Sequence, residues 1–304
     1  MNLSGLYAAL ATPVGARGDV DFTTLDRLTE FVLERGVGGL CIGGATSEYP
    51  RFEQAERRAI VDRVARRMPK EAALVVAVGA SSVPRTIELG QAAFAAGARG
   101  VLIPMPFFFR YEQIDLAAHV SHVAATLGGP CLLYDLPEFT TPLEVDTAIG
   151  LLEQDALVVG IKDSSGRPDN LMRFVEARGG QEWTLLVGDD RNLLAGLEAG
   201  WDGGVSGIAC CCPELLVGLH RSMRRGELDE ARRCQGLVDE LITHMSVLPI
   251  PWGVRVVLRA RGIDTGDFPL PLAGARAYQI ARFEAWLSTW LASAGIPNLQ
   301  PVAR

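Results

Sequence analysis

A lysine stands where an apolar run of strand-forming residues turns polar, in the stretch "VVGIKDSSG" at 158–166. Burial at such a strand end penalises the ammonium form, so we expect the pKa of this residue, Lys162, to be lowered. A neutral amine attacks ketones, and the resulting Schiff base withdraws electrons and so stabilises a carbanion or enamine. The alternative is a structural salt bridge with Asp163, but neighbouring residues on a strand point to opposite faces. The pattern therefore favours a catalytic lysine.

A tyrosine, Tyr134, lies near the end of the preceding apolar run, "PCLLYDLP" at 130–137. If the two runs form adjacent strands, its phenol lies close to Lys162. A phenol in that place can relay protons to and from a carbinolamine and the substrate oxygen. The alternative is a half-buried aromatic ring at a strand end, which would be preferred if Lys162 were absent.

Eight short apolar runs alternate with amphipathic segments along the chain. The runs span residues 5–13, 38–44, 73–80, 100–105, 130–137, 157–163, 183–189 and 203–209. Nearly continuous apolar runs are typical of parallel strands covered by helices. Eight strand–helix units predict an α/β fold, the (β/α)8 TIM barrel. An open doubly wound sheet is the alternative, but no strand is followed by a Gly-x-Gly-x-x-Gly or Walker sequence.

Helix signals mark two boundaries in this pattern. The capping-box spacing of Thr141-Pro142-Leu143-Glu144 predicts a helix that begins at Pro142. After about residue 225 the strand signal stops and helical patterns follow at 228–247, 251–261 and 274–294. We therefore expect a catalytic barrel at 1–225 and a C-terminal three-helix extension at 226–304. The last helix carries a wide apolar stripe, which would pack on the barrel or on another subunit. The stripe consists of Ile280, Phe283, Trp286, Leu287, Trp290 and Leu291.

Composition limits the classes of function. The 304 residues carry 29 basic and 36 acidic side chains, a net charge of −7, and no basic cluster, which argues against nucleic-acid binding. The N-terminus lacks signal-peptide features, and no apolar run reaches the ~18 residues that span a membrane. None of the six cysteines forms a Cys-x-x-Cys pair, and most lie in apolar runs, as in reduced core cysteines. We expect a cytoplasmic protein with no metal site and no membrane partner.

In a barrel of this kind the active site lies at the carboxyl ends of the strands. The small residues of the 44–48 loop offer backbone N–H groups that suit a carboxylate, and the hydroxyls of Thr46 and Ser47 add to them. Such a loop is also common as a simple tight turn. Three phenylalanines at 107–109 are ambiguous between a pocket wall and a subunit contact. The ends of the last two strands supply further candidates, namely Gly188, Asp190, Ser206 and Ile208.

Together these motifs resemble those of the dihydrodipicolinate synthase/N-acetylneuraminate lyase family, from Gly5 to about Leu272. The matching features are Tyr134 followed by Pro137, Lys162 in "GIKDSSG", the Gly-x-Thr-x-Glu loop at 44–48, "GDD" at 188–190 and "PIP" at 249–251. The resemblance implies a (β/α)8 barrel in which Lys162 condenses with the ketone of pyruvate or another 2-keto acid and Tyr134 relays protons. It implies that residues around Ala45, Thr46 and Ser47 hold the carboxylate of the keto acid. It also implies a homotetramer or homodimer, and neither cofactor nor metal, because the iminium withdraws the electrons.

Three positions depart from the synthase branch of that family. Ala45 replaces a threonine of the synthase proton relay, and Phe108 replaces a tyrosine that reaches across the subunit interface. Phe139 stands where the synthase has an arginine for the carboxylate of aspartate semialdehyde. These departures argue against the lysine-pathway reaction. What remains resembles the aldolases and dehydratases of 2-keto-3-deoxy sugar acids, in which Asp190, and as a further candidate Glu138, would contact sugar hydroxyls.

The sequence thus predicts a Schiff-base lyase that cleaves 2-keto-3-deoxy sugar acids to pyruvate and an aldehyde, or dehydrates them. One alternative is 4-hydroxy-tetrahydrodipicolinate synthase, which condenses pyruvate with aspartate semialdehyde. A second is a non-catalytic barrel that binds keto acids. The presence of both Tyr134 and Lys162 argues against the second, because a relic has no reason to keep the pair.

Overall fold

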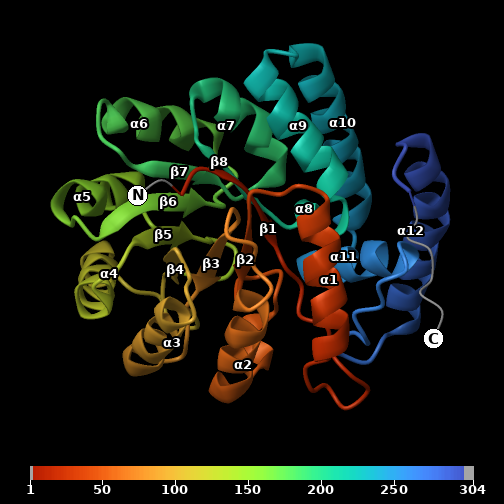
Figure 1. Cartoon of the computed structure of the whole chain (residues 1–304), viewed down its shortest axis with the longest axis horizontal. Coiled ribbons are helices and arrows are strands. Elements are labelled where there is room, and N and C mark those ends of the chain that lie inside the picture. The colour runs from red at the N-terminus through yellow and green to blue at the C-terminus, as the bar shows by residue number, and fades with distance from the viewer. Residues whose placement is uncertain (1–2, 298–304) are drawn as a thin grey trace.

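Eight parallel strands form a closed barrel in chain order, as the sequence predicts. The computed structural model describes residues 3–297. Each strand is shorter than its apolar run and pairs in parallel with its two neighbours in the chain, and the last pairs with the first (Figure 1). The strands are β1 Gly5–Ala9, β2 Gly39–Ile42, β3 Ala73–Ala77, β4 Gly100–Pro104, β5 Cys131–Asp135, β6 Val158–Asp163, β7 Thr184–Val187 and β8 Gly203–Ser206.

Helices surround the barrel, seven of them between successive strands and two, α8 and α9, after the last strand (Figure 1). They are α1 Phe22–Glu34, α2 Gln54–Ala65, α3 Val83–Ala95, α4 Gln113–Leu127, α5 Val145–Gln154, α6 Pro168–Arg178, α7 Leu193–Ala199, α8 Ile208–Cys211 and α9 Pro213–Arg225. The prediction that a helix begins at Pro142 is wrong. The amide of Leu143 donates to Asp135 Oδ1 at 3.0 Å, and that of Glu144 donates to Gln113 Oε1 at 2.9 Å. These side chains hold the segment extended, so α5 begins only at Val145.

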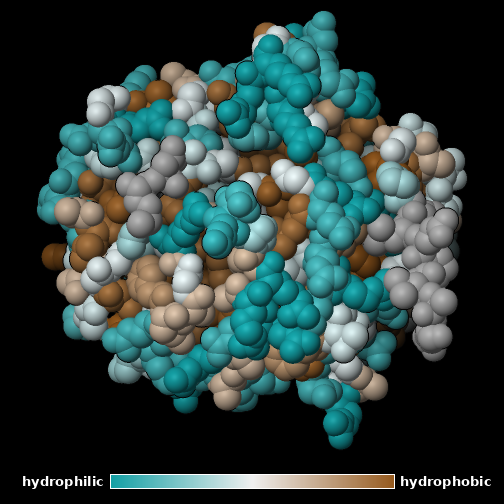
Figure 2. Space-filling view, viewed as in Figure 1, coloured by the Kyte–Doolittle hydropathy of each residue, from teal (hydrophilic) through white to brown (hydrophobic). Residues whose placement is uncertain are grey.

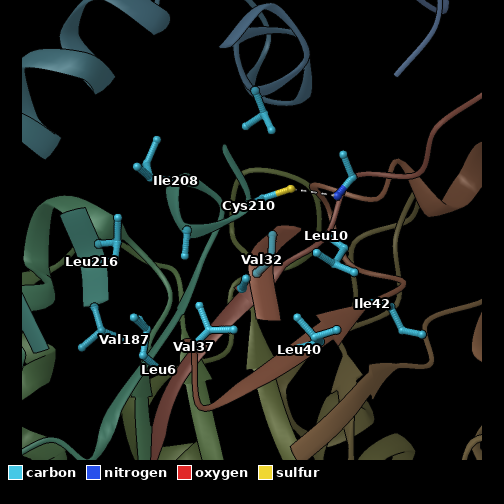
Figure 3. Close-up of a cluster of buried hydrophobic side chains, with 14 of the residues drawn as sticks. Leu6, Leu10, Val32, Val37, Leu40, Ile42, Val187, Ile208, Cys210 and Leu216 are labelled. Carbon is cyan, nitrogen blue, oxygen red and sulfur yellow. Dashed lines mark hydrogen bonds between the residues drawn. The ribbon is translucent and has the colours of Figure 1, made fainter. Parts of the chain in front are cut away.

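Alternation along the strands separates two apolar layers. On β1, Tyr7 and Ala9 face the barrel interior, whereas Leu6 and Ala8 pack outward beneath the helices. Figure 3 shows part of the outer layer, in which the Cys210 thiol accepts a hydrogen bond from the Ala11 amide at 3.3 Å. All six cysteines are buried and unpaired, as predicted. Because the period is two residues, the strand register decides which side chains enter the interior.

Three further helices form the C-terminal extension: α10 Leu228–Met245, α11 Ile250–Ala260 and α12 Gly274–Ser293. They lie on one side of the barrel, and α10 packs along α9 (Figure 1). All three helices were predicted, but residues 298–304 of the predicted extension lie outside the described residues. The division into domains at residue 225 stays a prediction.

The apolar stripe of α12 is buried within its own chain. Trp286 stacks on His244 of α10 with ring centroids 3.8 Å apart, and the Trp290 indole donates to Glu240 at 2.8 Å. The other stripe residues are at most 6% exposed. The stripe is therefore not a surface for another subunit, and it no longer supports an oligomer.

Exposed aromatic side chains gather instead between β4 and α4. Phe108 is 88% exposed and Phe109 is 65% exposed, with Tyr111 and Ile114 nearby in the chain. On the face that Figure 2 shows, hydrophilic and hydrophobic residues are mixed. By length and hydropathy, no single helix among the described residues qualifies as a membrane span. Only α10 and α11 taken together do, and they are bent by 111°.

Candidate active site

Lys162 and Tyr134 lie side by side in the barrel interior. Their Cα positions are paired in the β5–β6 register, and Lys162 Nζ donates to Tyr134 OH at 3.1 Å. The Nζ atom also lies 4.2 Å from the centre of the tyrosine ring. Asp163 points outward and accepts from the Ser165 amide at 2.7 Å, so it forms no salt bridge with Lys162. The sequence-based expectation that the pair lies within reach is confirmed.

The environment of Lys162 raises its pKa above the ordinary lysine value, so the predicted lowering is wrong. Burial is the largest influence and favours the neutral amine. Tyr134, Cys41 and Asp190 carry or can develop negative charge, and together they outweigh it by favouring the ammonium form. Sequence reasoning considered burial alone and left out the effect of these three groups on the pKa of Lys162. The resting amine therefore holds a proton that it must lose before it can attack a carbonyl.

Gly188, which follows β7, gives the Lys162 side chain its room. A Cβ atom at this position would lie 2.1 Å from Ser164 Oγ and 2.9 Å from Lys162 Cε. Any larger residue would displace one of these groups. Gly188 also lines the cavity above the lysine, so the glycine both admits the amine and borders the space that a substrate would enter.

The loop after β2 presents Ala45 and Thr46 to the same cavity. Within residues 3–297, the amides of Ala45 and Thr46 have no hydrogen-bond acceptor, and neither has the Thr46 hydroxyl. Ser47 differs from the expectation: its hydroxyl donates to Leu10 O at 2.7 Å and accepts from the Gly43 amide at 3.0 Å. That hydroxyl is used to shape the loop, and Ser47 does not line the cavity. The open donors of Ala45 and Thr46 suit an anion.

A buried ion pair fixes this loop to the C-terminal extension. The Glu48 carboxylate pairs with the guanidinium of Arg255 of α11, at 2.8 Å from Nε and 2.6 Å from a terminal nitrogen. The backbone φ of Glu48 is 52°. Arg255 also donates to Thr265 O at 2.6 Å and is 1% exposed. Sequence reasoning missed this pair, although the signal was present as a single cation within the apolar stretch "IPWGVRVV".

We expect Arg255→Met to destabilise the protein by about 3 kcal/mol, because removal of one partner leaves a buried charge uncompensated. In this variant the Glu48 carboxylate keeps a single ion pair, with Arg51 at 2.9 Å, and the side chain of Arg51 is 26% exposed. The matched control is Arg58→Met, which breaks an exposed pair with Glu88 and should lose less than about 1 kcal/mol. Urea unfolding of the two variants measures the difference, and equal losses would contradict a structural role for the buried pair.

Asp190 begins a short 3-10 helix, Asp190–Asn192, three residues after the end of β7, and its carboxyl group is enclosed although the residue keeps some exposure. Burial, and less strongly the charge of Asp189, raises the pKa of Asp190 to about 6, while Ser206, Ile208 and Lys162 act against this rise. The Ile208 amide donates to its Oδ2 at 3.1 Å. Ser206 is 1% exposed and does not line the cavity, contrary to expectation. It supports Asp190, while Ile208 and Asp190 border the cavity.

The candidate residues surround one cavity of about 430 Å³, with Lys162 and Tyr134 among its lining residues. Its walls come from the 44–48 loop, from the ends of β5 to β8, and from the segment 242–254 of the extension. Glu138 and Phe139 also line it. Phe108 does not, because it lies on the surface beside a different hollow.

Comparison with known proteins places the chain in a family. Residues 2–289 match the model of the dihydrodipicolinate synthetase family. A 4-hydroxy-tetrahydrodipicolinate synthase of Sorangium cellulosum is 34% identical over 90% of this chain and 91% of its own length. An uncharacterized DapA-like lyase of Halobacterium salinarum is 32% identical over 95% of this chain and 94% of its own.

Solved structures agree in fold. Dihydrodipicolinate synthase from Aquifex aeolicus superposes with a TM-score of 0.89 at 24% identity, covering 98% of this chain and 100% of its own. The 4-hydroxy-tetrahydrodipicolinate synthase of Methylacidiphilum fumariolicum gives 0.88 at 29% identity, covering 97% and 99%. The match extends over the barrel and the C-terminal helices alike. The chain therefore belongs to the dihydrodipicolinate synthetase family of lyases.

Proposed function

We propose that this enzyme is a lysine Schiff-base lyase that acts on pyruvate and on 2-keto-3-deoxy acids. The observation that carries the proposal is the 3.1 Å contact between Lys162 Nζ and Tyr134 OH inside the cavity. An amine and a phenol in contact supply a nucleophile and a proton carrier for the same carbonyl. Membership of a lyase family supports the reaction class.

In this mechanism the neutral Lys162 amine attacks the C2 carbonyl of the keto acid. Tyr134 returns a proton to the carbinolamine oxygen, which leaves as water and gives an iminium. In cleavage, the C4 hydroxyl loses its proton and the C3–C4 bond electrons enter the iminium, releasing an aldehyde and leaving an enamine. The enamine takes a proton at C3, and hydrolysis frees pyruvate and the lysine. In dehydration, C3 loses a proton and the C4 hydroxyl leaves as water.

The carboxylate of the keto acid would lie against the open amides of Ala45 and Thr46 and the Thr46 hydroxyl. In this arrangement Ser47 and Ser206 hold the loop and Asp190 in place, and Gly188 and Ile208 border the bound substrate. Asp190 stands near enough to Lys162 to influence its pKa, so its charge helps to determine when the amine is neutral.

The proposal is tested by assaying the protein with a set of 2-keto-3-deoxy acids and measuring pyruvate release or loss of water for each. The rival function, 4-hydroxy-tetrahydrodipicolinate synthesis, is favoured by the names of several relatives, the Sorangium protein among them. Condensation of pyruvate with aspartate semialdehyde is assayed beside it. We expect this activity to be poor, since Phe139 offers no charge to a second carboxylate. Robust synthase turnover would overturn the proposal, and inactivity in every assay would favour a non-catalytic barrel.

We expect the initial rate of pyruvate release, at substrate far below KM, to rise with pH by about tenfold per unit between pH 7 and 9. The raised pKa of Lys162 leaves only a small neutral fraction there, and that fraction grows as protons are removed. Asp190, with a pKa of about 6, is already ionised in this window and does not distort the slope. A rate independent of pH over this range would contradict the need to deprotonate the lysine.

A homotetramer or homodimer fits the exposed aromatic side chains of Phe108, Phe109 and Tyr111, which border one surface hollow, with the exposed Ile114 near them in the chain. Exposed apolar clusters of this kind commonly mark subunit contacts. Sedimentation of wild type and of Phe109→Ser would test it, with a shift of the variant towards the monomer expected. The cytoplasmic location stays a prediction.

A further inference from the structure

We propose that the part of the substrate beyond C4, its tail, is uncharged and apolar, so that the aldehyde released is an alkyl or aryl aldehyde. The inference rests on the proposed function, because it concerns the second half of the same cavity. It is carried by the apolar wall of the cavity and by the placement of charge around the cavity.

The apolar wall is built by the C-terminal extension and the segment after β5. Phe139 is 47% exposed and Ile250 is 48% exposed, and both line the cavity. Met245, Leu248 and Val254 also line it but are at most 8% exposed, so they form the packed backing of this wall. Phe139 and Ile250 thus keep apolar surface in contact with water that a ligand tail would displace.

Charge in the cavity is arranged against an anionic tail. Among the described residues that line the cavity, Lys162 is the one cation, and in the Schiff base its nitrogen is bonded to C2, so its charge stays at the keto-acid end of the substrate. Three carboxylates, those of Glu138, Asp189 and Asp190, border the same space. A carboxylate or phosphate on the tail would meet like charge with no counterion, which disfavours binding.

Three polar side chains that line the cavity, those of Asp189, Ser165 and Ser246, are already bound within the protein. The Asp189 carboxylate accepts from the Arg191 amide at 3.1 Å and from Asn192 Nδ2 at 3.3 Å. Ser165 Oγ accepts from Asn170 Nδ2 at 3.0 Å, and Ser246 Oγ donates to Thr243 O at 2.9 Å. Hydroxyls of a polyhydroxylated tail would compete with these bonds where they meet the three side chains and would stay unpaired where they meet the apolar wall, and an apolar tail avoids both penalties.

The experiment compares three 4-hydroxy-2-keto acids that share C1 to C4. Their tails are a butyl chain, the same chain fully hydroxylated, and a chain of equal length that ends in a carboxylate. We expect kcat/KM for pyruvate release to be at least about tenfold higher for the butyl adduct than for either of the others, since a pocket gains about that factor per buried methylene. Trapping of pyruvate on Lys162 by borohydride is measured in parallel.

Two threonine variants test the wall itself. Ile250→Thr should lower kcat/KM for the butyl adduct about fivefold and leave pyruvate trapping unchanged. Val247→Thr is the matched control, because Val247 is 47% exposed in the same segment and does not line the cavity, and no change is expected. Equal effects of the two variants would overturn the assignment of the wall.

The outcomes separate this inference from the proposed function. Absence of trapping and of any cleavage would overturn both. Normal trapping with the hydroxylated or the carboxylated adduct cleaved faster would overturn the apolar tail alone. Normal trapping with no cleavage of the butyl adduct would also overturn the apolar tail and leave the proposed function standing.

Discussion

Lys162→Ala is expected to abolish turnover, with kcat lowered at least about 10⁴-fold, because no other group in the cavity can form the covalent intermediate. Lys162→Arg should be equally inactive. It keeps a cation beside Tyr134, but a guanidinium stays protonated and does not attack carbonyls. Steady-state pyruvate release from a 4-hydroxy-2-keto acid measures both variants, and thermal unfolding checks that each is folded.

The chain offers a matched control for this result. It contains only two lysines, and the second, Lys70, is exposed between α2 and β3, at the end of the barrel opposite the cavity. Lys70→Ala should keep full activity. If Lys162→Arg, folded as wild type, retained more than about one hundredth of kcat, electrostatic rather than covalent catalysis would be indicated.

Tyr134→Phe is expected to lower kcat by about 10²-fold to 10⁴-fold while changing KM little, since a relayed proton contributes in this range. The ring is 1% exposed and packs in the barrel interior, so phenylalanine preserves the packing and removes only the hydroxyl. Loss of the phenol also removes an influence that raises the pKa of Lys162, so the pH–rate profile should move to lower pH.

Tyr7→Phe is the control for that variant. Tyr7 is also buried in the barrel interior, but its hydroxyl donates to Leu3 O at 2.8 Å, away from Lys162. We expect this change to leave kcat and the pH profile as in the wild type. Similar losses in both variants would show that disturbed packing, rather than a missing proton relay, explains the effect of Tyr134→Phe.

Local periodicity made the barrel and the Lys162–Tyr134 pair predictable. Apolar runs at regular intervals predicted eight strands, and the two-residue alternation that separates Lys162 from Asp163 also turns Tyr134 inward. The pair then follows from adjacency of β5 and β6 in a closed parallel sheet.

Long-range contacts could not be predicted in the same way. Arg255 meets Glu48 across 207 positions of the chain, and no local pattern tells where α11 docks. The same holds for Ile250, which lines the cavity only because the segment 242–254 of the extension reaches the carboxyl end of the barrel. The pKa of Lys162 depends on Cys41 and Asp190, which are far from it in sequence, and the wrong expectation followed from considering burial alone.

The central claim, imine formation at Lys162, is tested most directly by reduction with borohydride in the presence of pyruvate, followed by peptide mass analysis. We predict that one peptide gains the mass of pyruvic acid less one oxygen atom and that this peptide contains Lys162. Because the chain holds two lysines, the peptide with Lys70 serves as an internal control and should stay unmodified. A wild-type chain of unchanged mass, or modification confined to Lys70 or the N-terminal amine, would contradict the account.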